Sequence, residues 1–373
     1  MIAIKNCKYF KGSELVNASS VLIQDGKIID FINTSVPDGF KVVDAGGVLL
    51  TSGFTELQIY GCGGNLFSAY PSVETLAQMD NDIISKGTTS FLVCVATNSP
   101  SIVLQCIDAA KAYQSQARGF LGLHLEGPYL NAKRLGAHVP EYVKKATLDE
   151  VKSLLEYADG TVKMMTIAAE LQDEEVLNYL DEQGILLSLG HSDASFEQAN
   201  LAFHKGFKTT THLFNAMPSI HHRAPNLPTA VLNHPTAMAS IIADGQHVDF
   251  EVVKLAYKLM KERLFLITDA VTACGIGPYQ HQLSGNKFVT PEGTLSGSNI
   301  TLLQAVQNCV KACGVPLWEA LNMASRYPNE LISGTKRQDN LVVGMKADLL
   351  LLSDDLDIEK VFIGGDEHLI GNN

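Results

Sequence analysis

Two hydrophobic patterns alternate through the central part of the chain, residues 51–341. Short apolar runs predict eight strands, at Gly53–Gln58, Ser90–Val95, Gly119–Leu125, Lys163–Ile167, Ile185–Leu189, Lys208–His212, Ala237–Ile242 and Leu264–Thr268. Between them apolar residues recur at helical spacing, as in Val73–Lys86, Ile102–Gln116, Leu148–Tyr157, Glu174–Gln183 and Phe196–Lys205. Because a helical stretch follows each strand, the pattern predicts a closed (β/α)8 barrel of the TIM type rather than an open sheet.

The two ends of the chain have a different pattern, made of short strands and tight turns. The predicted strands are Ile2–Ile4, Ser20–Gln24, Lys27–Ile32, Val42–Asp44, Gly47–Leu50, Asp348–Leu352 and Lys360–Ile363. Asp25-Gly26 is a strong hairpin signal. Neither end is long enough for a core of its own. We therefore expect residues 1–50 and 342–373 to form one small β-sandwich module, beside a catalytic barrel of residues 51–341.

Composition and charge narrow the possible partners and location. The 373 residues are 46% hydrophobic and carry a formal net charge of −12, which argues against nucleic acid or an anionic membrane as the main partner. We see neither a secretory signal nor an apolar run long enough to span a bilayer. The seven cysteines are odd in number and scattered, which favours reduced thiols in a cytoplasm.

Potential metal ligands stand at the ends of three predicted strands. They are Glu126 in Leu123–Pro128, His191 in Leu189–Asp193, and His212 in Thr210–Pro218. Barrel enzymes build their sites at the carboxyl ends of their strands, so these side chains should meet at one mouth. One carboxylate and two imidazoles are typical of a catalytic zinc site that keeps a position open for water. The sequence therefore predicts a metal-dependent hydrolase.

Two further positions refine this chemistry. Asp269 ends the last predicted strand, where a carboxylate can take a proton from water and pass it to a leaving nitrogen. The first strand carries Glu56-x-Gln58 where many metallo-hydrolase barrels carry His-x-His. Gln58 is a poor ligand for a second metal, so we predict one metal, with Gln58 hydrogen-bonded to a metal-bound water or a neighbouring ligand.

The loops after the strands offer groups that suit a phosphate. They include Lys133–His138, Asn215 and Ala216, His221–Arg223, Ala243–His247, and a glycine-rich turn at Gly293–Ser298. Cationic side chains and free backbone N–H groups bind anions well. Lys133 and Arg134 are better explained as solvated surface charge. Arg223 lies among histidines and prolines just after a metal strand, and we favour an anion-binding role for it.

Taken together, these segments resemble the N-acetylglucosamine-6-phosphate deacetylases of the amidohydrolase superfamily. The resemblance runs nearly end to end and is carried by Gly53-Phe54, Gly61–Gly64, His124–Pro128, Lys133–His138, Gly190–Ser192, Thr211–Met217, Ala243–Gly245, His247 and Thr268–Ala270. It implies release of acetate from the acetamido group of the sugar phosphate, to give glucosamine 6-phosphate.

The resemblance also implies roles for individual residues. Glu126, His191 and His212 would hold one divalent metal, zinc in the first instance, although iron, cobalt and manganese also suit such ligands. Asp269 would be the general acid and base, and His138 would polarise the carbonyl. Substrate contacts would come from Ala137, His138, Asn215, Ala216, Arg223, His247, Leu295, Ser296 and Gly297. The family further suggests a homodimer in which Arg223 reaches the phosphate in the neighbouring subunit's site.

Three other functions remain open at this stage. The same chemistry on N-acetylgalactosamine 6-phosphate differs only at the C4 hydroxyl, and no residue of the sequence separates the two epimers. A cyclic-amide hydrolase is disfavoured because the first-strand histidine pair and an obvious bridging lysine are missing. A non-catalytic barrel would have no need for a full ligand set together with Asp269.

Overall fold

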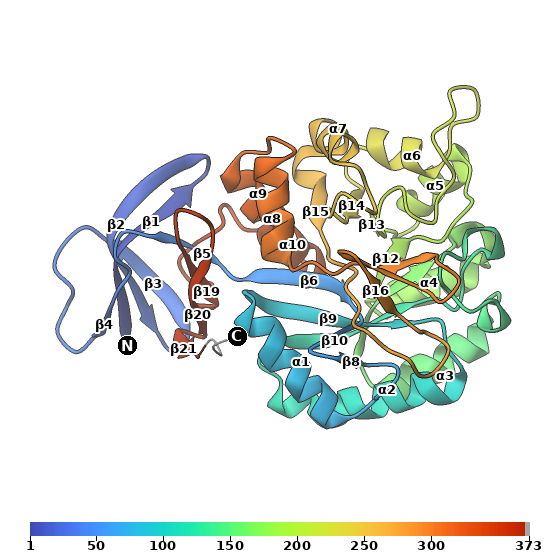
Figure 1. Cartoon of the computed structure of the whole chain (residues 1–373), viewed down its shortest axis with the longest axis horizontal. Helices are drawn as coiled ribbons and strands as arrows, with labels where there is room; N and C mark the ends of the chain where they lie inside the picture. Colours follow the sequence, from blue (N-terminus) through green and yellow to red (C-terminus); the bar gives the residue numbers. More distant parts are fainter. Residues whose placement is uncertain (370–373) are drawn as a thin grey trace.

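The computed structural model describes residues 1–369, which form a barrel beside a second sheet built from both ends of the chain (Figure 1). The barrel strands are parallel and lie in the order β6 (Phe54–Ile59), β9 (Thr88–Ala96), β10 (Phe120–Glu126), β11 (Val162–Ile167), β12 (Leu186–Leu189), β13 (Thr209–Thr210), β14 (Met238–Ile241) and β15 (Leu264–Leu266). A parallel bridge between Ile59 and Ala270 joins the first strand to the segment after the last. The predicted eight-stranded barrel is thereby confirmed.

Helices cover the outside of the barrel. They are α1 (Val73–Ser85), α2 (Pro100–Tyr113), α3 (Leu148–Ala158), α4 (Glu174–Glu182), α5 (Phe196–His204), α6 (Leu227–Asn233), α7 (Phe250–Met260), α8 (Leu302–Lys311), α9 (Leu317–Ala324) and α10 (Arg326–Ser333). Helix α2 begins two residues before its predicted start because Ser99 caps it and Pro100 is tolerated in a first turn. Helices α5 and α8 begin with capping boxes, at Ser195 and Thr301.

The second sheet draws its strands from the two ends of the chain. Its members are β1 (Ile2–Lys11), β2 (Glu14–Gln24), β3 (Lys27–Ile32), β4 (Lys41–Asp44), β5 (Leu49–Ser52), β19 (Leu349–Leu352), β20 (Ile358–Ile363) and β21 (Asp366–His368). The two ends meet where β5 pairs with β19 in antiparallel register. A separate apolar cluster that includes Ile4, Leu50 and Phe362 forms the core of this module. Burying such side chains is the main stabilising contribution available to so small a unit.

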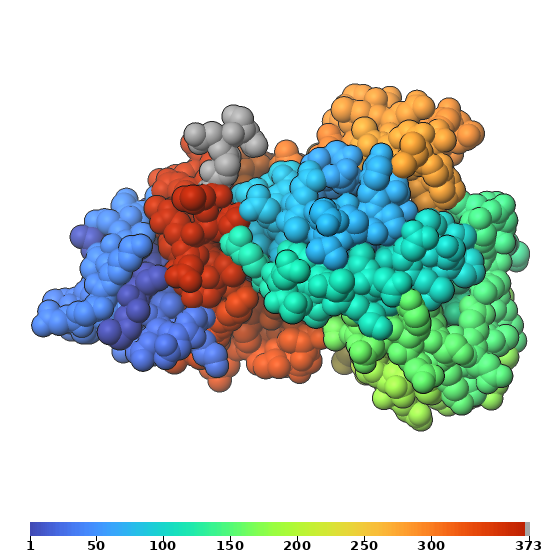
Figure 2. Space-filling model, turned by 90° about the horizontal axis from the view of Figure 1, so that it is seen from below, coloured from blue at the N-terminus to red at the C-terminus, as the bar shows by residue number. Residues whose placement is uncertain are grey.

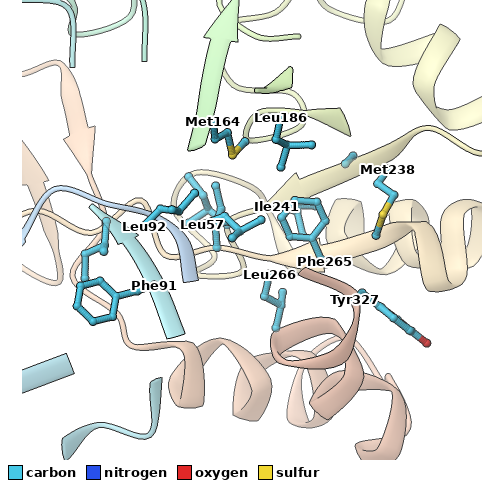
Figure 3. Close-up of a cluster of buried hydrophobic side chains, with 14 of the residues drawn as sticks. Leu57, Phe91, Leu92, Met164, Leu186, Met238, Ile241, Phe265, Leu266 and Tyr327 are labelled. Carbon is cyan, nitrogen blue, oxygen red and sulfur yellow. The ribbon is translucent and has the colours of Figure 1, made fainter. Parts of the chain in front are cut away.

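A large cluster of buried apolar side chains, from the barrel strands and the helices packed around them, forms the core of this domain (Figure 3). Leu57 comes from β6, Phe91 and Leu92 from β9, and Phe265 from β15, and all four are fully buried. Such a core fixes the strands, and therefore fixes the positions of the side chains at their ends.

Several short elements were not predicted. A small antiparallel sheet is formed by β16 (Gln282–Ser284), β17 (Lys287–Val289) and β18 (Leu295–Gly297). A second pair consists of β7 (Gly61–Cys62) and β8 (Asn65–Leu66). Single 3-10 turns lie at Gln114–Gln116, Ala132–Arg134, Pro140–Tyr142, Ala169–Leu171 and Lys261–Arg263 (η5). The expected glycine-rich turn is thus partly strand, since Leu295–Gly297 pairs with β17. The segment that contains β16 and β17 protrudes from the barrel (Figure 2). Among residues 1–369, no helix combines the length and apolarity that a membrane span requires.

Candidate active site

The predicted metal ligands meet at one mouth of the barrel. Glu126 is the last residue of β10, and His191 and His212 each follow the end of their strand by two residues. Both histidines have a left-handed backbone, with φ of 47° and 34°. Residues other than glycine rarely adopt this conformation, and it is concentrated at functional sites.

The ligating atoms converge around one point. His191 Nε2 and His212 Nε2 lie 3.2 and 3.1 Å from Glu126 Oε1, and 3.1 Å from each other. All three side chains are buried, and their candidate ligand atoms lie within 4.8 Å of one another. The sequence prediction that these residues come together is therefore confirmed.

The protons of the two imidazoles fit a cation at this point. His191 Nδ1 lies 2.8 Å from the carbonyl oxygen of Arg134, and His212 Nδ1 lies 3.2 Å from that of Asn215. A carbonyl can only accept, so each Nδ1 carries the proton and each Nε2 presents a lone pair. Two lone pairs and a carboxylate oxygen then face each other without a donor between them. This donor set suits a divalent metal, and the carbonyls fix the ring orientations.

Gln58 and Tyr60 hold the carboxylate of Glu126 in place. Gln58 Nε2 donates to Glu126 Oε1 at 2.9 Å, while the Tyr60 hydroxyl and His138 Nε2 contact Oε2, the latter at 3.0 Å. Gln58 is thus hydrogen-bonded to a candidate metal ligand, one of the two roles expected from the sequence. Burial disfavours the ionised form of Glu126, but the neighbouring His191 and His138 hold its pKa well below the ordinary value.

Asp269 lies three residues after the end of β15 and lines the same cavity. Its Oδ1 accepts from Gln58 Nε2 at 2.7 Å, so one amide nitrogen connects Asp269 to Glu126. Its backbone N–H donates to the carbonyl of Gln58, and its φ is 53°. Burial raises the pKa of the Asp269 carboxyl, and His212 opposes that shift. A carboxyl placed in this way can accept and return a proton.

A cavity of about 160 Å³ opens directly over these groups. The predicted substrate residues that line it are Ala137, His138, Asn215, Ala216, His247, Leu295, Ser296 and Gly297. His247 is oriented by Asp244, whose Oδ2 lies 2.7 Å from its Nδ1. Arg223 is exposed and does not line the cavity of its own chain. Lys133 and Arg134 form ion pairs with Asp193 instead.

Seven residues of the cavity lining were missed by the sequence analysis: Tyr60, Leu66, Ser68, Ala96, Val271, Tyr279 and His281. Tyr60 could have been found, because it follows Glu56 and Gln58 at the two-residue spacing of one strand face. Tyr279 and His281 lie in the irregular segment before β16, where no periodicity marks them. The Nδ1 atom of His281 lies 3.0 Å from Ser296 Oγ, and burial lowers the pKa of this imidazole to about 4, so it is neutral near pH 7.

Comparison with known proteins agrees with this geometry. The family model described as "Amidohydrolase family" matches residues 49–367, and the chain therefore belongs to the amidohydrolase family. Within that family it groups with the N-acetylglucosamine-6-phosphate deacetylases. It is 32% identical to the enzyme of that name from Haemophilus influenzae, across 97% of this chain and 98% of the relative. It is 31% identical to the one from Homo sapiens, across 98% and 95%.

Solved structures of the same family share the whole fold. The N-acetylglucosamine-6-phosphate deacetylase from Pasteurella multocida superposes with a TM-score of 0.92 at 31% identity, covering 98% of this chain and 99% of that one. A mutant of the Mycobacterium smegmatis enzyme, solved in complex with N-acetyl-D-glucosamine-6-phosphate, superposes with a TM-score of 0.88 at 26% identity, covering 99% of each chain.

Proposed function

We propose that this protein hydrolyses N-acetylglucosamine 6-phosphate to glucosamine 6-phosphate and acetate, with one divalent metal, most simply zinc, held by Glu126, His191 and His212. The observation that carries the proposal is the convergence of a buried carboxylate and two imidazoles, each with Nδ1 held by a backbone carbonyl, in the cavity that Asp269 also lines. When bound there, a divalent cation supplies Lewis-acid polarisation of the substrate carbonyl and of water.

The side chains of the cavity divide the remaining chemistry between them. Asp269 takes a proton from the attacking water at its carboxylate and returns it to the amide nitrogen, so that the C–N bond breaks and the amine leaves neutral. His138 lines the cavity with its Nε2 against Glu126 Oε2, so the protonated imidazole would donate from Nδ1, which has no other partner among the described residues, to the carbonyl oxygen as negative charge develops on it. Gln58 donates to Asp269 Oδ1, which keeps that oxygen oriented as an acceptor.

The phosphate of the substrate needs positive charge that the cavity does not contain. Among the residues that the structure describes, no lysine or arginine lines it. The cavity instead offers hydrogen-bond donors, such as backbone N–H groups near Asn215 and Ala216 and the imidazole of His247. We place Arg223 of a second subunit there, because it is exposed on a loop and has no ion-pair partner within the described part of the chain.

An apolar stripe on α7 supports the homodimer that this arrangement needs. Val252, Leu255 and Leu259 are 37, 51 and 52% exposed and fall on one face of the helix. Helix α6, which directly follows the Arg223 loop, packs against α7. Exposed apolar patches of this kind often mark protein–protein contacts.

We also place the protein in a reducing cytoplasm, since all seven cysteines are free.

The first test is acetate release from N-acetylglucosamine 6-phosphate in the presence of zinc. The unphosphorylated sugar is the control for the phosphate site, and N-acetylgalactosamine 6-phosphate tests the epimer. We expect rapid release from the phosphorylated gluco sugar and little from the unphosphorylated one. Release from none of them, with metal shown to be bound, would overturn the substrate assignment.

A further inference from the structure

A second cavity lies at the end of the barrel opposite to the metal ligands. Its lining includes Lys208 and Met238, at the starts of β13 and β14, whereas His212 follows the end of β13. Helix α10 and the η5 turn close its sides. Its volume is about 700 Å³, which is within the range typical of small-molecule sites. The reaction proposed above uses none of these residues.

The side chains of this cavity carry an excess of positive charge. Only two carboxylates, Glu262 and Glu330, line it, against five cationic side chains: Lys208, Arg263, Arg326, Lys336 and Arg337. The protein as a whole has a formal net charge of −12. A cationic cavity on an acidic protein attracts anions locally, because nearby charges and low-dielectric walls focus the field.

The carboxylates of the cavity do not balance these cations. Glu330 alone accepts from three neighbours: Arg326 Nε at 2.7 Å, Lys336 Nζ at 3.2 Å and the backbone N–H of Arg337 at 2.8 Å. Arg263 has no carboxylate partner within the described residues and donates instead to the carbonyl oxygens of Val231, Leu232 and Ala237.

Among the cationic side chains of this cavity, Arg337 provides the strongest argument for an anion-binding site. Its Nε is buried without any hydrogen-bond acceptor, and its Nη1 contacts only the sulfur of Met345, at 3.8 Å. No carboxylate among residues 1–369 forms an ion pair with this side chain. A partly buried guanidinium with an unpaired donor is unfavourable, and an anion that entered the cavity would relieve this.

We propose that this cavity binds the phosphate monoester of a small organic molecule. Arg337, together with the ammonium groups of the exposed Lys208 and Lys336, would hold the phosphate, because a guanidinium pairs well with phosphate oxygens. The organic part would lie against the apolar wall that Phe203 and Tyr327 provide. The volume exceeds what inorganic phosphate alone would fill.

Isothermal titration of the full-length protein with AMP, glucose 6-phosphate and inorganic phosphate tests this proposal. We expect at least one of the two esters to bind more tightly than inorganic phosphate. The variant Arg337→Gln should weaken that binding more than about tenfold, because a charge-assisted contact is lost. The double variant Lys208→Gln/Lys336→Gln should weaken it about three- to tenfold, and its exposed side chains leave the fold intact.

The matched control is Lys41→Gln/Lys152→Gln. It makes the same change in net charge at two exposed lysines, on β4 and α3, that line neither this cavity nor the catalytic one. Because binding at the catalytic mouth is equal in both double variants, the difference between them isolates the second cavity. Equal affinities in both double variants, or esters that bind no more tightly than inorganic phosphate, would overturn the proposal whether or not the protein is a deacetylase.

Discussion

At the scale of single residues, Gln58 joins the two halves of the candidate site. Its amide nitrogen has two hydrogens and lies 2.9 Å from Glu126 and 2.7 Å from Asp269. An imidazole at this position would offer another metal ligand, whereas an amide donor keeps both carboxylates in the acceptor state. The two carboxylates can therefore take different roles in the proposed reaction. Glu126 binds the metal together with the two imidazoles, and Asp269 accepts and returns the proton.

Replacing Asp269 by Asn should remove catalysis and spare metal binding. The amide oxygen of Asn can still accept from Gln58, but the side chain cannot take a proton from water. We expect turnover to fall roughly 10³-fold, the usual size of a general acid–base contribution. Metal content measured on the purified variant is the control and should equal that of the wild type. Near-normal turnover would show that another group moves the proton.

The residues that could be predicted are those placed by a strand end. Glu126, His191, His212 and Asp269 were assigned because parallel strands bring their carboxyl ends together. His281 could not be predicted, since it enters the cavity from an irregular segment whose path depends on tertiary packing. Arg223 was assigned an anion-binding role, and one chain alone does not bring it to the cavity.

At the scale of elements, hydrogen bonds to a buried carboxylate connect β6 to the segment after β15. Glu56 is 1% exposed and accepts from the backbone N–H groups of Gln58 and Thr268, both at 2.9 Å. It therefore holds the residue before Asp269 in register with the first strand. The eight strands could be predicted from apolar periodicity, but this closure depends on a contact between residues far apart in the sequence.

The pH dependence of stability should reveal Glu56. Burial raises its pKa from 4.5 to about 8, so the folded state binds a proton that the unfolded state has lost. Its contribution is complete below pH 4.5 and is lost as the pH rises towards 8, about 5 kcal/mol in total. Urea unfolding at pH 5 and pH 8 should show a smaller fall for Glu56→Gln, which cannot titrate, than for the wild type. Equal falls would contradict this pKa.

The turn after β12 has no room for a side chain at Gly190. A Cβ there would lie 2.8 Å from Thr166 Cγ2 and 2.8 Å from Thr211 Cβ. Gly190→Ala should therefore displace His191 and weaken metal binding about 10- to 100-fold, as disturbed ligand support usually does. Gly275→Ala is the matched control, because nothing lies within 4 Å of its Cβ. Competition with a metal-binding dye measures both, and equal affinities would contradict a rigid turn.

At the scale of the whole molecule, the net charge of −12 opposes an anionic substrate unless local positive charge offsets it. The catalytic mouth has no cationic side chain of its own among the described lysines and arginines, so the proposed dimer would complete it. Two-fold symmetry repeats each contact, so the Arg223 loop of each subunit would complete the phosphate site of the other subunit. Assembly and substrate binding are then coupled, although the fold of one subunit is complete without its partner.

This coupling predicts a linked loss of assembly and affinity in Leu255→Glu. A carboxylate on the apolar stripe of α7 should give a monomer by light scattering, and the KM for the sugar phosphate should rise about tenfold or more as the partner's arginine is lost. Leu15→Glu, at a leucine of the terminal sheet that is 50% exposed, should remain dimeric and active.

Arg223→Gln should raise the KM for the sugar phosphate without changing the mass of the dimer measured by light scattering. Mixing it with Asp269→Asn should restore activity, because one site of each mixed dimer then has an intact Asp269 and receives an intact arginine from the other chain. A fully active monomer, or no recovery on mixing, would exclude the exchange between subunits.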